Sequence, residues 1–347
     1  MKLRNLLPVI LLIFLVHFLL SPTAAVSESN EVNVAMYGGS FADMTKKCYI
    51  EPFEEQYKAK VNVVIGNSTD NLAKLRAQKN NPQIDVAYMD WSVALQAKNE
   101  GLIEKLNHEK IPNMSELYEK AIGKDGYLVA QLFACTGMAY NTQFVKEPPK
   151  SWKELWDAKY KGKIALCDIT GTAGYQTLLM AARINGGDIR NLDPGFKAIE
   201  KLRDSIVTFY THADQLVSLV ERGEVWIAPW YHDRTAFAGQ KGVPVAFAFP
   251  KEGTVAILPA LTIVKGCKNK ELAEKYVNIV LDADNQKCFS ENMFEGPVNR
   301  RVRLDPDLAK KMPYGQDQIE AMYVPDYEYV SEHRGEWTER WNKEIAR

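Results

Sequence analysis

The sequence contains few of the residues that build metal centres and almost no excess charge of either sign. Its five cysteines form no Cys-x-x-Cys pair, and its five histidines show no ligand spacing. The 43 basic and 44 acidic residues give a formal net charge of −1. Nucleic-acid-binding proteins carry a basic surface, and structural metal sites need closely spaced ligands. We therefore expect no nucleic-acid partner, no metal site and no cofactor.

The motifs of common enzyme active sites are also missing. The sequence has no Gly-x-Ser-x-Gly elbow, no His-Glu-x-x-His pair, no P-loop and no Gly-x-Gly-x-x-Gly turn. Tyr231, His232 and Asp233 could be imagined as metal ligands, but adjacent residues at a strand end point apart. We predict no catalytic residues and no enzymatic activity. A secreted hydrolase that uses Asp168 or His232 is the competing class, and turnover of a bound compound would identify it.

A long apolar run occurs at the N-terminus. Lys2 and Arg4 precede the apolar residues 6–20, and Ser-Pro-Thr-Ala-Ala follows at 21–25. This order is that of a secretory signal peptide, and the run is shorter than the ~20 residues that span a bilayer. We predict a signal peptide over residues 1–25, cleaved after Ala25, so that the protein is secreted across the inner membrane. An uncleaved anchor is the alternative.

The cysteines of an exported protein can form disulfides. An odd number leaves at least one thiol free. Cys135 and Cys167 lie within apolar runs and are predicted to be buried free thiols, because free cysteine is among the most buried residue types. Cys267 and Cys288 could pair, although the sequence alone does not decide this.

The rest of the chain alternates between strand-like and helix-like patterns. Short apolar runs, most of them followed by a polar turn and a helical pattern, occur at 32–36, 61–65, 85–89, 164–167, 207–210 and 225–228. Such alternation predicts an α/β protein with mostly parallel sheets covered by helices. A longer extended run at 254–264 is interrupted by Pro259, and such a run can pass from one sheet to another.

Polar and aromatic side chains gather just beyond these runs. In open α/β sheets, ligands bind outside the carboxyl ends of the strands. Pro229 is expected to end the strand at 225–228, which would place Trp230 at the sheet edge. The candidate ligand-binding residues are Tyr37, Gly39, Ser40, Asp90, Trp91, Asp168, Thr170, Thr172, Trp230, Tyr231, Asp233 and Arg234.

These candidates divide by chemistry. Trp and Tyr faces hold ammonium groups and apolar stems, although core packing is the competing interpretation for any one aromatic residue. Gly39 either lets the backbone approach a ligand or only forms a tight turn. In the hypothesis, Trp230 and Tyr37 or Trp91 stack on the solute, Asp90, Asp168 or Asp233 meets a positive group, and Thr170, Thr172 and Arg234 meet a negative group.

Five short motifs point to one family. They read Ser-Trp-Lys-Glu-Leu-Trp at 151–156, Tyr-Lys-Gly-Lys-Ile at 160–164, Gly-Glu-Val at 223–225, Pro-Lys-Glu-Gly at 250–253 and Lys-Asn-Lys-Glu at 268–271. Together they resemble the type 2 periplasmic solute-binding proteins of ABC importers, most nearly the spermidine/putrescine-binding group. The resemblance covers almost all of the chain after the predicted signal peptide.

The resemblance implies a two-lobed α/β fold of the type 2 periplasmic-binding-protein class, with a hinge between the lobes. Lobe 1 would comprise residues 31–134 and 261–299, and lobe 2 residues 140–257 and 300–347. A periplasmic monomer would close over one small-molecule solute in the cleft and dock on the membrane permease of an ABC importer.

The resemblance also bears on the ligand. By position, Trp230 matches an aromatic wall of the polyamine binders and Asp168 lies near one of their carboxylates. Where those proteins carry a Trp and an Asp that grip an amine, this chain has Ile257 and Pro259. The segment 170–175 resembles the helix start of relatives that bind anions. We predict a zwitterion or short amine rather than a long polyamine, with a ferric iron or anion receptor as the alternative.

Overall fold

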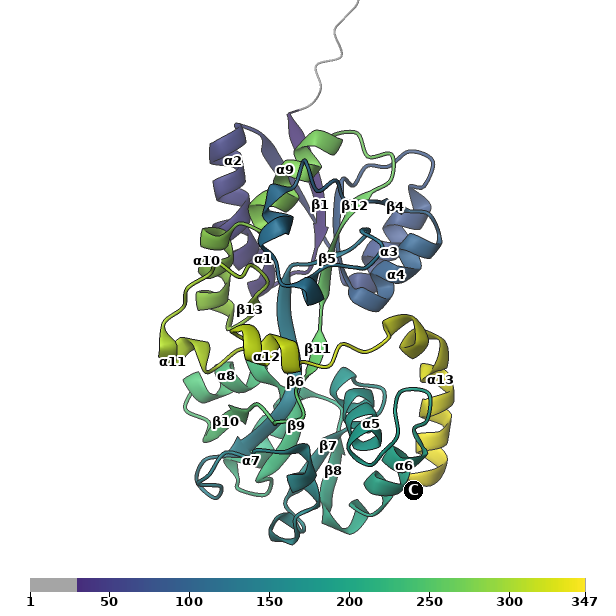
Figure 1. Ribbon diagram of the computed structural model, residues 1–347, viewed down its shortest axis with the longest axis vertical. Helices are drawn as coiled ribbons and strands as arrows, with labels where there is room; N and C mark the ends of the chain where they lie inside the picture. Colours follow the sequence, from purple (N-terminus) through teal and green to yellow (C-terminus); the bar gives the residue numbers. More distant parts are fainter. Residues whose placement is uncertain (1–29, 347) are drawn as a thin grey trace, which may run out of the picture.

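The computed structural model describes residues 30–346, which form two α/β units that lie one above the other in Figure 1. The predicted signal peptide, residues 1–25, lies outside the described residues. Within the described range, no helix combines the length and the apolar character that crossing a membrane requires. The architecture is the expected one of two sheets, each flanked by helices.

The first unit is assembled from two separate parts of the chain. Its strands are β1 (Glu31–Met36), β2 (Lys60–Ile65), β3 (Val86–Asp90), β4 (Ile103–Glu104), β5 (Val129–Ala130) and β12 (Pro259–Val264). Its helices are α1 (Ser40–Thr45), the π-helix η1 (Lys46–Ile50), α2 (Glu51–Tyr57), α3 (Ser68–Ala77), α4 (Trp91–Asn99), α9 (Lys270–Val280) and α10 (Ala283–Met293). The strands pair in the order β2-β1-β3-β12-β4, with β5 also on β12.

The second unit is formed mainly by the intervening chain. Its strands are β6 (Leu132–Asn141), β7 (Ile164–Cys167), β8 (Ile206–Tyr210), β9 (Ile227–Tyr231), β10 (Val245–Ala248), β11 (Val255–Ile257) and β13 (Gly296–Pro297). Its helices are α5 (Thr172–Ile184), α6 (Asp193–Glu200), α7 (Ala213–Glu221) and α8 (His232–Gln240). The strands pair in the order β10-β6-β9-β7-β8, and β11 and β13 also pair with β6.

Both sheets are mixed, so the prediction of mostly parallel sheets is wrong. β1 is parallel to β2 and β3, and β7 is parallel to β8 and β9. However, β12 is antiparallel to β3, and β6 is antiparallel to β9, β10 and β11. The reason is that β6 and β12 enter their sheets from the other unit and therefore run against the local strand direction.

Two extended segments connect the units. One runs through β5 and β6, and the other runs back through β11 and β12. β5 pairs with β12 in the first sheet, and β11 pairs with β6 in the second. The two segments therefore pass side by side through the junction, as Figure 1 shows. The predicted passage of residues 254–264 from one sheet to the other is confirmed.

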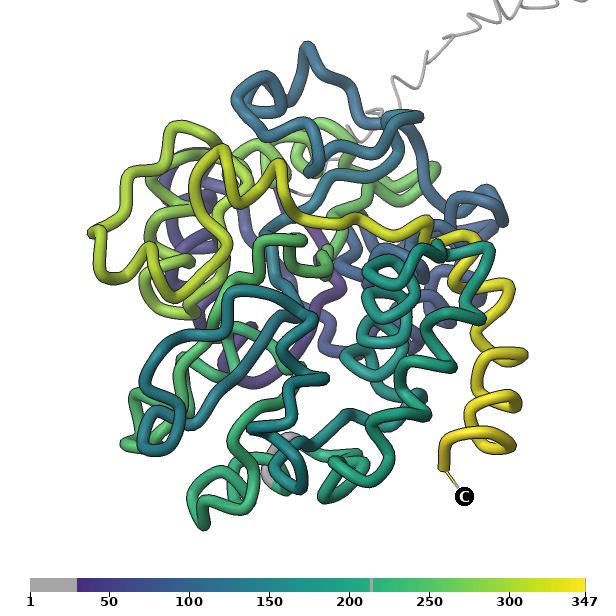
Figure 2. Tube along the Cα trace, turned by 60° about the horizontal axis from the view of Figure 1, so that its bottom comes forward, coloured from purple at the N-terminus to yellow at the C-terminus, as the bar shows by residue number. Residues whose placement is uncertain are grey.

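The C-terminal segment contacts both units. After β13 it forms α11 (Pro306–Ala309), α12 (Gln316–Ala321) and α13 (Tyr327–Glu344), and Figure 2 shows it crossing the molecule before α13 runs along the second unit. Ile319 and Met322 are buried in the same core cluster as β1 and β3. Trp337 and Trp341 are buried in the core of the second unit. The lobe boundaries given above, which assign all of 300–347 to lobe 2, stay a prediction.

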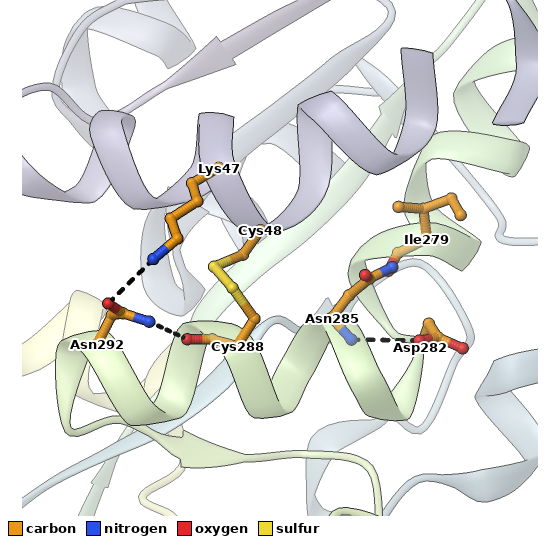
Figure 3. Close-up of a disulfide and its surroundings, with 7 residues drawn as sticks. All are labelled: Lys47, Cys48, Ile279, Asp282, Asn285, Cys288 and Asn292. Atoms are coloured by element: carbon orange, nitrogen blue, oxygen red, sulfur yellow. Dashed lines mark hydrogen bonds between the residues drawn. A yellow bond between two sulfur atoms is a disulfide. The ribbon is translucent and has the colours of Figure 1, made fainter. Parts of the chain in front are cut away.

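One disulfide joins the two separate parts of the chain that form the first unit. Cys48 on η1 is bonded to Cys288 on α10, 240 residues later in the chain (Figure 3). The loop that this bond closes contains the whole central part of the second unit. Cys135 and Cys167 are buried free thiols, as predicted, and Cys267 is a partly exposed free thiol. The partner of Cys288 is therefore Cys48 and not Cys267.

Removing this disulfide should destabilise the protein. A crosslink across so long a loop restricts the unfolded chain, and losing a native one typically costs about 2–5 kcal/mol. We expect the Cys48→Ser/Cys288→Ser variant to lose about that much free energy of unfolding in urea titrations without reductant. Cys267→Ser is the control and should unfold like the wild type. Equal stability of the double variant and the wild type would contradict a structural role for this bond.

Candidate functional site

A cavity of about 440 Å³ lies between the two units, next to the connecting segments. This volume is within the range of small-molecule sites, about 300–1,000 Å³. Eight of the twelve predicted ligand-binding residues line it, namely Tyr37, Ser40, Asp90, Trp91, Thr172, Tyr231, Asp233 and Arg234. Tyr37 and Ser40 follow β1, Asp90 ends β3, and Trp91 begins α4. Thr172 begins α5, Tyr231 ends β9, and Asp233 and Arg234 lie in the first turn of α8. The carboxyl ends of the strands therefore converge on one cavity from both units.

Trp230 is not part of this cavity, and the prediction that it forms the pocket wall is wrong. Its side chain is 1% exposed and packs in a core cluster of the second unit. The strand does not end at Pro229. Beyond Ile227, β9 no longer pairs with β7, so the proline interrupts no hydrogen bond on that side. On its other side β9 continues to pair with β6 as far as Tyr231. Since successive strand residues point to opposite faces, the next residue, Tyr231, is the one that faces the cavity.

Three further candidates, Asp168, Thr170 and Gly39, lie in turns that lead into helices and do not line the cavity. Asp168 Oδ1 accepts hydrogen bonds from the backbone N–H of Thr170 (3.0 Å) and from its hydroxyl (2.5 Å). This carboxylate and Thr170 thus shape the turn before α5 and are not among the residues that line the cavity. Gly39 precedes α1 with φ 64°, a conformation that favours glycine, and Gly38 lines the cavity in its place.

The first unit supplies a carboxylate set among aromatic rings. The Tyr37 hydroxyl donates to Asp90 Oδ1 (3.1 Å), and the Asp90 backbone N–H donates to the Ser68 hydroxyl oxygen (2.9 Å). Burial raises the pKa of Tyr37, so its hydroxyl stays protonated and able to donate. Within residues 30–346, Asp90 forms no ion pair with a lysine or arginine. Its negative charge is therefore available to a bound solute.

The second unit contributes Tyr231 and the start of α5. The Tyr231 hydroxyl oxygen accepts a hydrogen bond from the Ala173 backbone N–H in the first turn of α5 (3.2 Å). Burial raises the pKa of Tyr231 and raises that of Tyr175, which also lines the cavity, to about 12. Both rings therefore stay neutral near pH 7 and form polar aromatic walls of the cavity.

Arg334, on α13, lines the same cavity and was missed by the sequence reasoning. Its guanidinium lies over the Tyr175 ring, 4.6 Å from the centroid, and donates to the Thr170 carbonyl oxygen (2.5 Å). One signal could have revealed it. Tyr327, Val330, Trp337 and Trp341 are the buried residues of α13, at helical spacing, and position 334 falls on that same face.

Glu295 and His232 meet at the junction beneath the cavity. The Cys135 backbone N–H donates to His232 Nδ1 (3.2 Å), and Nε2 lies 2.8 Å from the Phe294 carbonyl oxygen. Nδ1 therefore accepts a hydrogen bond and Nε2 carries a proton, and Nε2 also lies 3.3 Å from Glu295 Oε2. Glu295 lines the cavity, and burial, followed by the nearby charge of Asp233, raises its pKa to about 7.

The charged side chains that line the cavity differ in whether they have a partner of opposite charge. Asp233 forms an ion pair with Arg234 (3.6 Å). Glu295 is partly protonated at neutral pH because of its raised pKa. Asp90 and Arg334 remain, and neither forms an ion pair with another side chain in the described chain. The cavity thus presents one uncompensated negative group and one uncompensated positive group.

A second cavity, of about 350 Å³, lies at the opposite edge of the first sheet. It is formed by the segments that follow α3, α4 and β12. Lys79 and Lys265 line it, and its lining contains neither an acidic nor an aromatic side chain. The features of a small-molecule site are therefore concentrated in the cavity between the units.

The raised pKa of Glu295 predicts a pH-dependent cost to stability. A carboxyl whose pKa is higher in the folded chain than in the unfolded chain favours folding below its unfolded pKa, near 4.5, and loses that effect as the pH rises through about 7. Glu295→Gln should remove about 3 kcal/mol of this pH-dependent loss between about pH 4 and about pH 8. Urea titrations across that range would measure it. Glu291→Gln, an exposed site on α10, is the control, and identical pH profiles for Glu295→Gln and the wild type would contradict the assignment.

Comparison with known proteins gives the family. A family model described as bacterial extracellular solute-binding protein matches residues 48–313, which is most of the chain. The gamma-aminobutyric acid-binding protein of Pseudomonas aeruginosa is 26% identical over 343 residues, with 93% of each chain covered. The spermidine/putrescine-binding periplasmic protein of Escherichia coli is 25% identical over 318 residues, which cover 88% of this chain and 86% of the relative.

Solved structures agree with these matches. An ABC transporter protein from Clostridium perfringens shares 30% identity at a TM-score of 0.80, over 90% of this chain and 99% of that one. A GABA receptor shares 25% identity at a TM-score of 0.73, over 90% of this chain and 96% of that one. These matches confirm the predicted two-lobed fold of a periplasmic binding protein and the prediction that the protein is not an enzyme. The chain therefore belongs to the bacterial extracellular solute-binding proteins, and it is the solute-binding protein of an ABC transporter.

Proposed function

We propose that the protein captures a small solute with a protonated amino group in the cavity between its two units. The observation that carries this proposal is Asp90, whose carboxylate lines the cavity without a cationic partner in the described chain. Tyr37, Trp91 and Tyr231 line the same space. Aromatic faces attract ammonium groups, and a carboxylate accepts their hydrogen bonds. Such a cavity suits a short amine or a zwitterion.

The relatives support the same chemical class. Gamma-aminobutyric acid, spermidine and putrescine, which the names of the two relatives state as ligands, all carry an amino group. The lining of this cavity includes Ile257 and Pro259, which are apolar, next to the connecting segments. A long polyamine needs a second anionic anchor for its other end. The solute proposed here is therefore shorter than spermidine.

The architecture supports a proposed route for capture and delivery. The segment 1–25 directs export, and the protein acts as a monomer in the periplasm. The paired connections β5–β6 and β11–β12 form the hinge, so that bending there closes the two units over the solute. The solute shifts the population toward the closed form, and that form docks on the membrane permease of an ABC importer.

Isothermal titration calorimetry with a small panel of compounds tests the proposal. 4-Aminobutyrate, putrescine and 2-aminoethylphosphonate carry an amino group, and butyrate is the matched compound without one. We expect at least one of the three amines to bind and butyrate not to bind. Asp90→Asn should weaken amine binding by about tenfold or more, since a charged hydrogen bond contributes about 1.5–3 kcal/mol.

The control variant for this experiment is Asp317→Asn. Asp317 is an exposed carboxylate on α12 and does not line the cavity, so its loss should leave amine affinity unchanged. Binding of butyrate as tightly as 4-aminobutyrate would show that the amino group is not recognised and would overturn the proposal. Unchanged amine affinity in Asp90→Asn would remove Asp90 from the site.

A further inference from the structure

We propose that Arg334, on the C-terminal helix α13, binds the acidic end of the solute and makes the receptor selective for linear ω-amino acids over diamines. This inference rests on the proposed function, because it assigns the second end of a solute whose amino group lies at Asp90. Both residues line the same cavity, Asp90 from the first unit and Arg334 from the C-terminal segment. The charges of an ω-amino acid match this pair.

The position of Arg334 on its helix is unusual for an arginine. Val330 and Trp337, one turn before and one turn after it on the same face, are 3% and 6% exposed. Arginine on the buried face of a helix costs desolvation energy unless the guanidinium has partners. Tyr327, at the start of α13, also lines the cavity and donates through its hydroxyl to the Ala256 carbonyl oxygen (2.7 Å). The helix is thereby fixed against the floor of the cavity.

The guanidinium of Arg334 is held in place but its charge is not compensated. Stacking on Tyr175 and one hydrogen bond to the Thr170 carbonyl oxygen orient it. A guanidinium has five N–H donors, so most of them remain for a ligand. In the described chain no carboxylate pairs with Arg334. An oriented guanidinium without a counter-ion suits two-point binding of a carboxylate or phosphonate.

Arg340, on the same helix, shows the contrasting arrangement. Its guanidinium pairs with Asp193 (2.5 Å) and Glu344 (3.0 Å) and stacks on Phe196 (4.1 Å from the centroid). It does not line the cavity. Both arginines lie on α13, both are partly buried, and each stacks on an aromatic ring of its own. Only Arg340 has acidic partners, which marks Arg334 as the one that a ligand completes.

The other positive groups of the cavity are less suited to this role. Arg234 is 63% exposed at its side chain and already pairs with Asp233. The Ala173 backbone N–H, in the first turn of α5, already donates to the Tyr231 hydroxyl oxygen. A diamine bound at Asp90 would bring its second ammonium group toward Arg334. The resulting repulsion gives selectivity against diamines, because like charges in a confined site are costly.

The test compares 4-aminobutyrate with putrescine, which has the same four-carbon chain and an amine in place of the acid. Calorimetric titrations would use the wild type, Arg334→Met, Arg334→Lys and Arg340→Met. Methionine keeps the apolar contact with Tyr175 and removes the charge, whereas lysine keeps the charge and loses the two-point geometry. Circular dichroism and urea titrations would check that each variant is folded.

We expect the wild type to bind 4-aminobutyrate about 100-fold more tightly than putrescine. Arg334→Met should lose about 100-fold in affinity for 4-aminobutyrate and gain affinity for putrescine, Arg334→Lys should lose about tenfold for 4-aminobutyrate, and Arg340→Met should leave both affinities within about threefold. The lysine variant keeps the test decisive if the methionine variant does not fold.

The outcomes separate this inference from the proposed function. If the wild type binds amines but prefers putrescine, or if the Arg334 variants keep full affinity for 4-aminobutyrate, the role of Arg334 is overturned and the amine receptor stands. If the wild type binds no amine of the panel, the proposed function fails and the role of Arg334 fails with it.

Discussion

The rest of the structure depends on the antiparallel pairing of the two segments that connect the units. Every backbone polar group that passes through this buried junction needs a partner, and the walls of the cavity supply several of them. The Trp91 backbone N–H, at the start of α4, donates to the Leu258 carbonyl oxygen (3.1 Å). The Ala256 carbonyl oxygen accepts from Gln176 Nε2 on α5 (2.8 Å) and from the Tyr327 hydroxyl on α13 (2.7 Å). The segments that we propose as the hinge therefore also form the floor of the cavity.

The sequence revealed the parts of the site that follow regular strands. Tyr37, Asp90 and Trp91 could be predicted because β1 and β3 are short apolar runs whose ends are visible in the residue order, and side chains beyond such ends gather at one edge of a sheet. The α/β class could be predicted from the alternation of strands and helices, and the two-lobed fold from the family resemblance that the short motifs carry. The mixed sheets could not, because strand direction depends on which unit each connecting segment enters.

The failures have equally specific causes. Trp230 was misplaced because a proline within a strand is tolerated where one neighbour no longer pairs, and the sequence gives no sign of where pairing stops. Arg334 was missed because only the fold brings α13 to the cavity. In the sequence it lies far from the predicted cavity residues of the second unit, which run from Thr172 to Arg234. Its place on the buried face of a helix was nevertheless readable from the spacing. The Cys48–Cys288 bond joins positions that only the return of the chain into the first unit brings together.

The C-terminal helix α13 contacts both units and carries the arginine that we propose binds the solute. Arg334 is held by Thr170 and Tyr175 of the second unit, while Glu328 on the same helix pairs with Lys98 of the first unit (3.1 Å). Glu328 is 50% exposed, and an exposed pair of this kind contributes only about 0.2–1 kcal/mol. A solute that bridges Asp90 and Arg334 inside the cavity would act in a drier environment, where attraction between charges is stronger. In the proposed complex the solute, rather than the surface ion pair, would therefore be the stronger electrostatic tie between the units.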